Sequence, residues 1–305
     1  MFLAFQGAIA QGILWGVMVL GVYITFRLLD IADLTVDGSF ALGGCTCAVL
    51  IVETGIDPWL GLLAGLLVGV LAGAVTGLLH TVFDIPAILA GILTQIGLWS
   101  INLRIMGKAN VPLLRNHTIF SDFAGVTGLG VNVATIIIGL LLTVALIGAL
   151  YWFFGTEIGS ALRATGNNED MVRALGVDTR ITKLLALMVS NGLVGLSGAL
   201  VCQSQKYADV GMGTGAIIVG LAAIVIGEVL GRVMPGHLRS FSSRLIAAVV
   251  GSIMYFLIRA IVLQMGLDPN DMKLLSAIIV ALALAVPVVM ERAAARRAFS
   301  KGGEA

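Results

Sequence analysis

The chain has 305 residues, of which 59% are hydrophobic and only 11% are charged, and its mean hydropathy is +1.05. A soluble domain carries about a quarter of its residues as charged side chains, so this composition excludes a soluble globular protein. The formal net charge of +1 excludes little, because in a membrane protein the position of each charge matters more than the sum. Apolar stretches of about 18 residues or more recur without the alternation of a β-barrel, which predicts an all-α polytopic membrane protein.

The apolar stretches predict helices near residues 7–27, 39–52, 58–80, 86–106, 133–155, 182–202, 214–231, 245–265 and 273–290. The stretch 39–52 is short for a full crossing and follows the polar run "LLDIADLTVDG". The first two segments are therefore predicted to form one discontinuous helix or a re-entrant pair. We expect a single transmembrane domain over 1–305, with about eight to ten transmembrane or half-membrane helices. Its halves are 1–155 and 183–305, and a cytoplasmic loop over 156–182 joins them.

Two segments in the two halves resemble each other. "DIADLTVDGSFALGG" (30–44) and "KYADVGMGTGAIIVG" (206–220) share Ala-Asp followed by a glycine-rich run that opens a helix of small residues. Broken helices in corresponding halves indicate a transport pathway, although glycine-rich segments also match by chance. Asp33, Asp37 and Asp209 are candidates for the path or its gate, because a charge at membrane depth normally faces a cavity or a partner. The competing interpretation is that they cap the helices after them, which suits Asp37 especially well.

Polar side chains also recur at helical spacing within the fourth span, at Thr94, Gln95, Trp99 and Asn102. Amides that faced lipid would be left without partners, so this stripe faces either protein or a pore. Thr94 and Gln95 are therefore further candidates for the translocation path, and Asn191 joins them from a later span.

Lysine and arginine residues set the predicted orientation. They concentrate in the loops 156–183 and 232–244 and in the tail after residue 290, and pairs of spans separate these three regions, so all three are predicted to face the cytoplasm. The loop 107–132 breaks the pattern, because Arg104, Lys108 and Arg115 lie in or beside it although it is predicted to face outside. It either contacts an external partner or is a tolerated exception. Of the isolated charges within spans, Glu228 is predicted to reach water at a cytoplasmic end and Arg259 to extend toward the membrane surface.

The segment "RATGNNEDMVRALG" (163–176) is unusually polar for this chain. Asn167 or Asn168 is a typical N-cap residue, since its side chain can accept from free N–H groups of a first helical turn. Glu169 and Asp170 then lie at the positive end of the helix dipole, and Arg173 lies near the negative end. The pattern predicts a helix of about two turns.

Gly176 is predicted to end this helix in the left-handed conformation. Met171 and Leu175 share one face, which something must cover. Either the helix lies against its own membrane domain, or it docks a cytoplasmic subunit.

The run "EIGSALRATGNNEDMVRALGVDTRITKLLALMVSNGLVGLSGAL" (157–200) resembles the cytoplasmic loop and following span of the ribose and branched-chain amino-acid permeases, which are subunits of bacterial ABC importers. The residues that carry the resemblance are Gly159, Arg163, Ala164, Gly166, Asn168, Ala174, Gly176 and Val177. The segment "ADLTVDGSF" is similar to a subgroup sometimes assigned to tryptophan or other amino acids. Asp170 and Met171 depart from the family, which often has alanine there.

The resemblance implies that the polar segment is a coupling helix for a separate ATPase, formed by Arg163, Asn167, Asn168, Glu169, Met171, Arg173, Leu175 and Gly176. It also implies a homodimer of this permease in the lipid of a bacterial inner membrane, a cytoplasmic C-terminus and an extracytoplasmic substrate-binding protein. ATP and Mg²⁺ would bind to the ATPase, and no cofactor to this chain, which has no G-x-x-x-x-G-K-[ST] loop.

The chain is not expected to be an enzyme, because its sequence contains no nucleophile–base pair and no cluster of metal ligands, and no nucleic-acid partner is expected. Two alternatives to the importer remain. One is a secondary transporter coupled to H⁺ or Na⁺ through Asp33 and Asp209, and the other is an intramembrane scaffold or exporter subunit.

Overall fold

The computed structural model describes residues 2–114, 116–233 and 240–266, together with positions 271, 274, 277, 278, 281, 282 and 285. The longer helices are α1 (Phe2–Tyr23), α2 (Val36–Thr54), α3 (Pro58–Thr81), α4 (Ala87–Met106), α6 (Val131–Gly155), α9 (Thr179–Gln205), α10 (Ala216–Val233) and α11 (Phe241–Gln264). Shorter elements are the π-helix η1 (Ile24–Leu28), α5 (Ile119–Thr127), α7 (Glu157–Asn167), α8 (Glu169–Ala174), and strands β1 (Asn110–Pro112) and β2 (Tyr207–Asp209).

The predicted all-α membrane architecture is confirmed. Seven helices in the described part are long and apolar enough to cross a membrane, and the segment 36–54 is one of them. The loop 107–132, for which no element was predicted, contains β1 and α5, and β1 pairs antiparallel with β2 so that Asn110 lies opposite Asp209. The predicted helix 273–290 falls mostly outside the described residues, and so does the tail.

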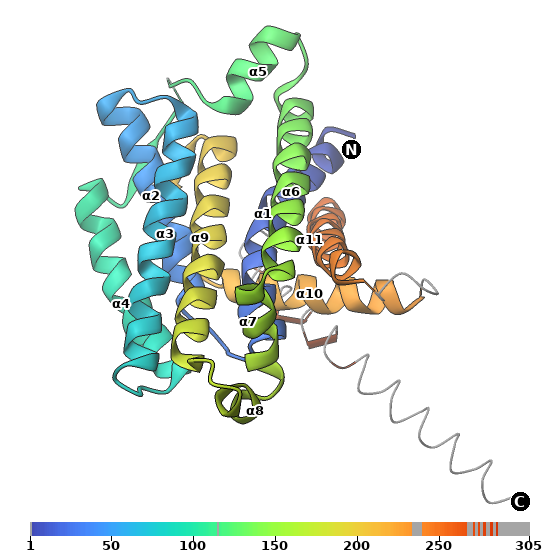
Figure 1. Cartoon of the computed structure of the whole chain (residues 1–305). Helices are drawn as coiled ribbons and strands as arrows, with labels where there is room; N and C mark the ends of the chain where they lie inside the picture. The colour runs from blue at the N-terminus through green and yellow to red at the C-terminus, as the bar shows by residue number, and fades with distance from the viewer. Residues whose placement is uncertain are drawn as a thin grey trace, which may run out of the picture.

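Helix α9 lies at the centre of the bundle, between α1, α2 and α3 (Figure 1). Glycines recur at every fourth position along one face of α3, at residues 61, 65, 69, 73 and 77. A Cβ added at Gly69 or Gly73 would lie against a backbone carbonyl oxygen of α9. Small residues at this spacing let two helix backbones approach closely, and dispersion then holds helices together where lipid offers no hydrophobic driving force.

Helices α1 and α9 run antiparallel and are joined by two side-chain hydrogen bonds. Ser197 Oγ donates to the Leu14 carbonyl and Ser190 Oγ to the Gly21 carbonyl, each at 2.8 Å. Each of these helices leads into one of the two similar segments. Beyond them, α3 packs along α9 and α11 packs along α1. The two halves of the described chain therefore place comparable helices in comparable positions with opposite direction.

The two similar segments also share local geometry. Asp30 and Lys206 are their first residues, and both have a positive φ, 55° and 59°. Three residues later Asp33 accepts a hydrogen bond from the Thr35 N–H at 2.9 Å, and Asp209 accepts one from the Gly211 N–H at 2.7 Å. A left-handed turn followed by an aspartate that bonds two residues ahead thus occurs twice, which supports the predicted internal repeat.

The two segments differ in how each joins its next helix. The first continues at once into α2, whereas the second runs through irregular chain at 210–215 before α10 begins. Helix α10 lies across the bundle (Figure 1) and is not among the seven candidate spans. The predicted helix over 214–231 is confirmed by α10, with its start shifted to Ala216, because the glycine-rich chain before it is irregular.

Candidate functional site

The polar segment begins with α7, which the sequence pattern did not predict. Thr156 caps it by accepting from the Gly159 N–H, and Leu162 and Thr165 are buried against the bundle. Gly166 faces the end of η1, where a Cβ would overlap the Leu28 carbonyl oxygen. The close approach leaves room only for glycine, so α7 lies directly against the backbone at the end of η1.

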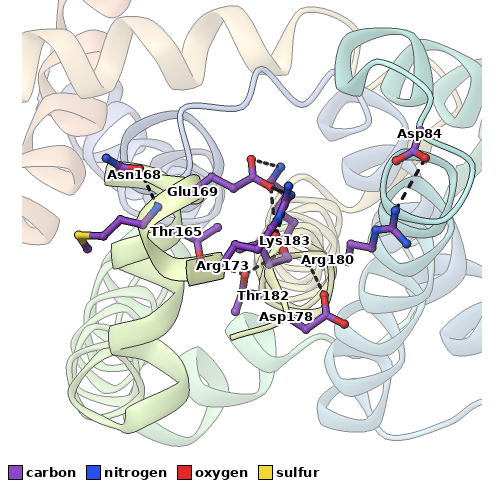
Figure 2. Close-up of polar contacts among 11 residues, drawn as sticks. Asp84, Thr165, Asn168, Glu169, Arg173, Asp178, Arg180, Thr182 and Lys183 are labelled. Carbon is purple, nitrogen blue, oxygen red and sulfur yellow. Dashed lines mark hydrogen bonds and ion pairs between the residues drawn. The ribbon is translucent and has the colours of Figure 1, made fainter. Parts of the chain in front are cut away.

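Helix α8 follows after a one-residue break at Asn168 and is tied to α9 through Glu169 (Figure 2). Lys183 Nζ donates to Glu169 Oε2 at 2.6 Å, while Arg173 Nη2 and Thr179 Oγ1 lie 2.9 and 3.0 Å from Glu169 Oε1. Next to them, the Thr165 and Thr182 hydroxyls form a hydrogen bond 3.0 Å long between α7 and α9. One carboxylate therefore anchors both ends of α8 to the start of α9.

The surroundings of Glu169 lower the pKa of its carboxyl group below the ordinary value of 4.5. The hydrogen bond from Lys183 is the largest cause, and the Thr179 hydroxyl and the Arg173 charge act in the same direction, while partial burial opposes them. The anchor is consequently charged at any pH near neutrality.

The anchored helix leaves two large apolar side chains in solvent. Met171 is 50% exposed and Leu175 is 74% exposed, whereas Val172 between them is buried at 2%. Beside α7, a hollow of about 560 Å³ is lined by Arg27, Arg163 and Arg244, and no carboxylate is among the described residues that line it. The end of the bundle that carries α7 and α8 thus combines a fixed apolar ridge with a basic hollow, which is suited to a protein partner with an apolar cleft and an acidic rim.

The structure tests the predicted cap and the predicted end of the short polar helix. Asn168 is the N-cap of α8, since its side chain accepts from the Met171 N–H, and Asn167 is the last residue of α7. Gly176 is left-handed with φ of 85°, as predicted. The sequence pattern missed Lys183 and Thr179 as partners of Glu169. Both lie near the start of the following span, where Lys183 is a basic residue at the beginning of an apolar run, and this was the available signal.

The first broken segment places Asp33 inside the bundle at 2% exposure. Its second oxygen accepts from the Asn191 amide at 2.7 Å, and Asn191 in turn accepts from the Ser39 hydroxyl at 2.7 Å. The Thr35 and Thr76 hydroxyls lie 2.7 Å apart next to this group. Asp33 and Asn191, predicted separately, therefore belong to one buried polar network that joins the start of α2 to α9.

Asp37 caps a different helix from the one expected. It lies in the first turn of α2, yet its two oxygens accept from the Gly215 and Ile217 N–H groups, at 2.8 and 2.9 Å, at the start of α10. The cap interpretation is correct in kind but wrong in its helix, because the partner lies 178 residues away and no local pattern reveals it. Asp209 caps no helix directly, and a role of these carboxylates in transport stays a prediction.

The residues of the polar stripe on α4 differ in their burial. Thr94 and Asn102 are buried at 7% and 1%, and Trp99 is 50% exposed. Thr94 donates to the Ala90 carbonyl of its own helix, and the Asn102 side-chain oxygen has no hydrogen-bond partner in the described part of the chain. The backbone of Gln95 lies against Gly38 at the start of α2, so the stripe partly faces protein.

A further ion pair lies at the α7–α8 end, where Arg27 of η1 contacts Glu228 of α10. Glu228 therefore has a partner there, a contact the sequence did not predict. The pair lines a cavity of about 360 Å³ together with Tyr23 and Arg244. It joins the end of the first helix to the helix that comes after the second broken segment.

These features define a multi-pass membrane protein with two similar irregular segments and an exposed apolar ridge at one end. Residues 5–286 match the family described as the permease component of branched-chain amino acid transport systems, and the chain belongs to this family. No solved structure matches it. It is a transport component, as predicted.

Three curated relatives are similar over most of the chain. The tyrosine transport system permease protein of Clostridioides difficile (strain R20291) is 36% identical over 88% of this chain and 86% of its own. An uncharacterised protein of Rickettsia prowazekii (strain Madrid E) is 32% identical over 91% and 95%. The probable branched-chain amino acid transport permease protein LivH of Methanocaldococcus jannaschii (strain ATCC 43067 / DSM 2661 / JAL-1 / JCM 10045 / NBRC 100440) is 27% identical over 81% of each chain.

Proposed function

We propose that this chain is the membrane-spanning permease of an ATP-driven importer of amino acids in a bacterial inner membrane. Two copies form the translocation path, a cytoplasmic ATPase subunit supplies the energy and holds ATP and Mg²⁺, and an extracytoplasmic protein delivers the substrate. The family match and the names of two relatives, which refer to tyrosine and branched-chain amino acids, support this substrate class.

The observation that carries the proposal is the fixed exposure of Met171 and Leu175. An apolar side chain on a mobile loop could turn inward, but α8 is anchored at Glu169 and is bracketed by the Asn168 cap and Gly176. The two side chains are therefore held in water at a cost, since removing such side chains from water is favourable by about 1.5–3 kcal/mol each. A partner cleft that buries them recovers this free energy.

The rigid attachment also provides a route for coupling. The Thr165–Thr182 and Glu169–Lys183 contacts join the ridge to the start of α9, and α9 carries Asn191 of the buried network further along. Closure of the ATPase subunits would move α7 and α8 as one body, and α9 would transmit the displacement to the broken segments. Two discrete arrangements of packed helices can convert such a small displacement into alternating access.

The test is the substitution Leu175→Asp in the full permease, expressed together with its ATPase. Docking would bury an unpaired carboxylate, at a cost of several kcal/mol by order of magnitude, so the ATPase should be lost on co-purification or hydrolyse ATP without transport. Leu114→Asp is the matched control, because Leu114 is 75% exposed in the loop before α5, at the opposite end. It should leave the complex intact.

Retention of the ATPase and of transport-coupled turnover by the Leu175→Asp permease would show that docking occurs elsewhere. The same preparation distinguishes the ATP-driven importer from the ion-coupled secondary transporter. A secondary transporter would take up substrate in response to an H⁺ or Na⁺ gradient without the ATPase, whereas the importer requires both ATP and the second subunit.

A further inference from the structure

A cavity of about 560 Å³ lies where α1, α9, α10 and α11 meet, beside the second broken segment. Its lining includes Trp15, Gln205, Met212, Ile218, Val219 and Arg259. A second cavity of about 360 Å³ adjoins it and shares Trp15, Gln205 and Arg259 while adding Gln11. The larger cavity is also lined by Asp37 of α2 and by Gly215, the residue before α10. Substrate sites in transporters are commonly formed at such helix breaks.

Arg259 brings a positive charge to this apolar region. Within the described part of the chain its guanidinium has no ion pair, and its aromatic contact is with the Phe256 ring, 5.8 Å from the centroid. A guanidinium is always charged, and its parallel N–H groups match the two oxygens of a carboxylate. An arginine that lines a cavity among hydrophobic helices is best explained by an anionic group that enters the cavity.

Trp15 adds a second donor at the same place. Its indole ring is fixed between Phe40 and Phe256, with ring centroids 4.7 and 5.5 Å away. The indole N–H is buried and has no hydrogen-bond partner in the described part of the chain. Because an unmade buried hydrogen bond costs free energy, this donor is expected to have a partner in a functional state.

Gln11 supplies the complementary acceptor. Its side-chain nitrogen donates to the Ser204 hydroxyl at 3.4 Å, which fixes the amide, while its side-chain oxygen is buried without a partner among the described residues. Arg259 and Trp15 line both cavities, and Gln11 lines the smaller one. The larger one also contains Asp37, whose oxygens accept from the Gly215 and Ile217 N–H groups. Beyond them, Met212, Ile218 and Val219 form an apolar wall.

We propose that these cavities bind the zwitterionic backbone of an α-amino acid with an apolar or aromatic side chain. Arg259 and the Trp15 N–H bind the α-carboxylate, the Gln11 oxygen accepts from the α-ammonium group, and the side chain lies along Met212 and Ile218. The inference rests on the proposed function and specifies its substrate contacts. A solute without a carboxylate leaves Arg259 and the indole N–H unpaired and is rejected for that reason.

The test measures equilibrium binding of L-tyrosine and L-leucine, up to millimolar concentration, to the purified permease–ATPase complex in lipid nanodiscs. Tyramine, which lacks the carboxylate, and N-acetyl-L-tyrosine, which lacks the ammonium group, are measured beside them. At least one amino acid should bind. If tyrosine is that ligand, tyramine should bind more weakly than L-tyrosine by roughly tenfold or more, because it lacks the carboxylate that Arg259 binds.

Arg259→Gln should lower the affinity for the bound amino acid by roughly tenfold or more and remove most of the preference for the carboxylate. Arg259→Lys should retain part of both, because it keeps the charge but loses the paired geometry. Trp15→Phe keeps the aromatic contacts and should lose a smaller part. Arg104→Gln is the matched control, since Arg104 is an exposed arginine at the end of α4 that does not line the cavity, and it should leave the affinity unchanged.

Three results would overturn the proposal: no binding of either amino acid to the wild type, equal binding of amino acids and their decarboxylated analogues, or unchanged affinity in Arg259→Gln. The last result would assign Arg259 a structural role at the membrane surface. Co-purification of the ATPase in the same samples keeps the proposed function separate, because docking at α8 does not depend on the cavity.

Discussion

Asp33 uses both of its oxygens inside the bundle, one for the Thr35 N–H and one for the Asn191 amide. The sequence allowed this residue to be a path residue or a cap; the structure shows its bond to the Thr35 N–H just before α2, and a role in the transport path stays a prediction. The carboxylate holds the start of α2 in place while it lies beside α9. A buried carboxyl group of this kind needs every hydrogen bond that it makes, because removing one leaves a polar group without a partner.

The substitution Asp33→Asn tests this arrangement. The new amide can keep the Thr35 contact through its oxygen, but its nitrogen then faces the Asn191 nitrogen, so two donors oppose each other. We expect uptake to fall at least fivefold, equivalent to about 1 kcal/mol, while the amount of permease in the membrane stays unchanged. The assay is uptake of labelled substrate into cells or vesicles, normalised to membrane expression.

Asp209→Asn provides the comparison, since Asp209 occupies the matching position in the second segment. This substitution is expected to impair uptake as well. Wild-type uptake in both variants would reduce the two aspartates to turn-forming residues without a role in the transport path.

At the scale of elements, α8 shows how a short helix becomes a fixed surface. Six residues are too few for a stable helix in water, so its order depends on the Asn168 cap and on the contacts of Glu169 with Lys183, Arg173 and Thr179. The helix is therefore only as stable as its anchor to α9, and the anchor depends on one ionised carboxylate.

The pH dependence of this anchor follows from the lowered pKa of Glu169. Because the folded pKa lies below the ordinary value of 4.5, the charged form contributes stability above that value. The contribution is lost as the pH falls through the lowered pKa, and nothing changes between pH 6 and pH 8 from this group. Hydrogen–deuterium exchange in the segment 168–176, corrected for intrinsic rates, should rise at acidic pH.

Glu169→Gln should raise exchange in the same segment at neutral pH and remove the acid dependence. Asp170→Asn is the control, because Asp170 is exposed next to it and the described residues give it no ion pair, so it should leave the profile unchanged. If the acid dependence of exchange survives in Glu169→Gln, a group other than Glu169 anchors the helix.

For the whole molecule, the arrangement of helices depends on close contact of α9 with α2 and α3. A Cβ on Gly195 would overlap the Gly65 carbonyl oxygen, and one on Gly43 would overlap the Gly195 carbonyl oxygen. Three helices from distant parts of the sequence thus meet at one point through backbone atoms. The polar network of Asp33 and Asn191 lies one turn along α9 from this point. The position of this network therefore depends on the same close packing of α9 against α2 and α3.

Gly195→Val should therefore disturb the whole bundle. The extra methyl groups can be accommodated only if α3 moves away from α9, and overpacking of this kind costs about 1–3 kcal/mol or more. We expect a lower midpoint of thermal unfolding in detergent and a loss of monodisperse protein on size-exclusion chromatography.

Gly97→Val is the matched control, since a Cβ at Gly97 meets nothing within 4 Å and the same change should leave the midpoint within a degree or two. A Gly195→Val permease as stable as the wild type would show that the α3–α9 contact is not required for the fold.

Hydrophobic runs and basic loops were sufficient to predict an all-α membrane protein, because the cost of burying backbone polar groups in lipid leaves little alternative to helices. The same local chemistry predicted a cap at Asn167 or Asn168, the left-handed Gly176 and the similar segments, and the family followed from the polar motif. The glycine run of α3 is visible in the sequence, but its partner is not.

Contacts between distant residues were decided by the tertiary structure. The pairing of Asp37 with the start of α10, of Arg27 with Glu228, and of Glu169 with Lys183 depends on which helices lie side by side. Periodicity along one helix carries no information on that choice, because a polar side chain can be satisfied equally well by many partners. The irregular chain before α10 and the cavity beside Arg259 arise from the same cause: both exist only once α9 has brought the two halves of the chain together.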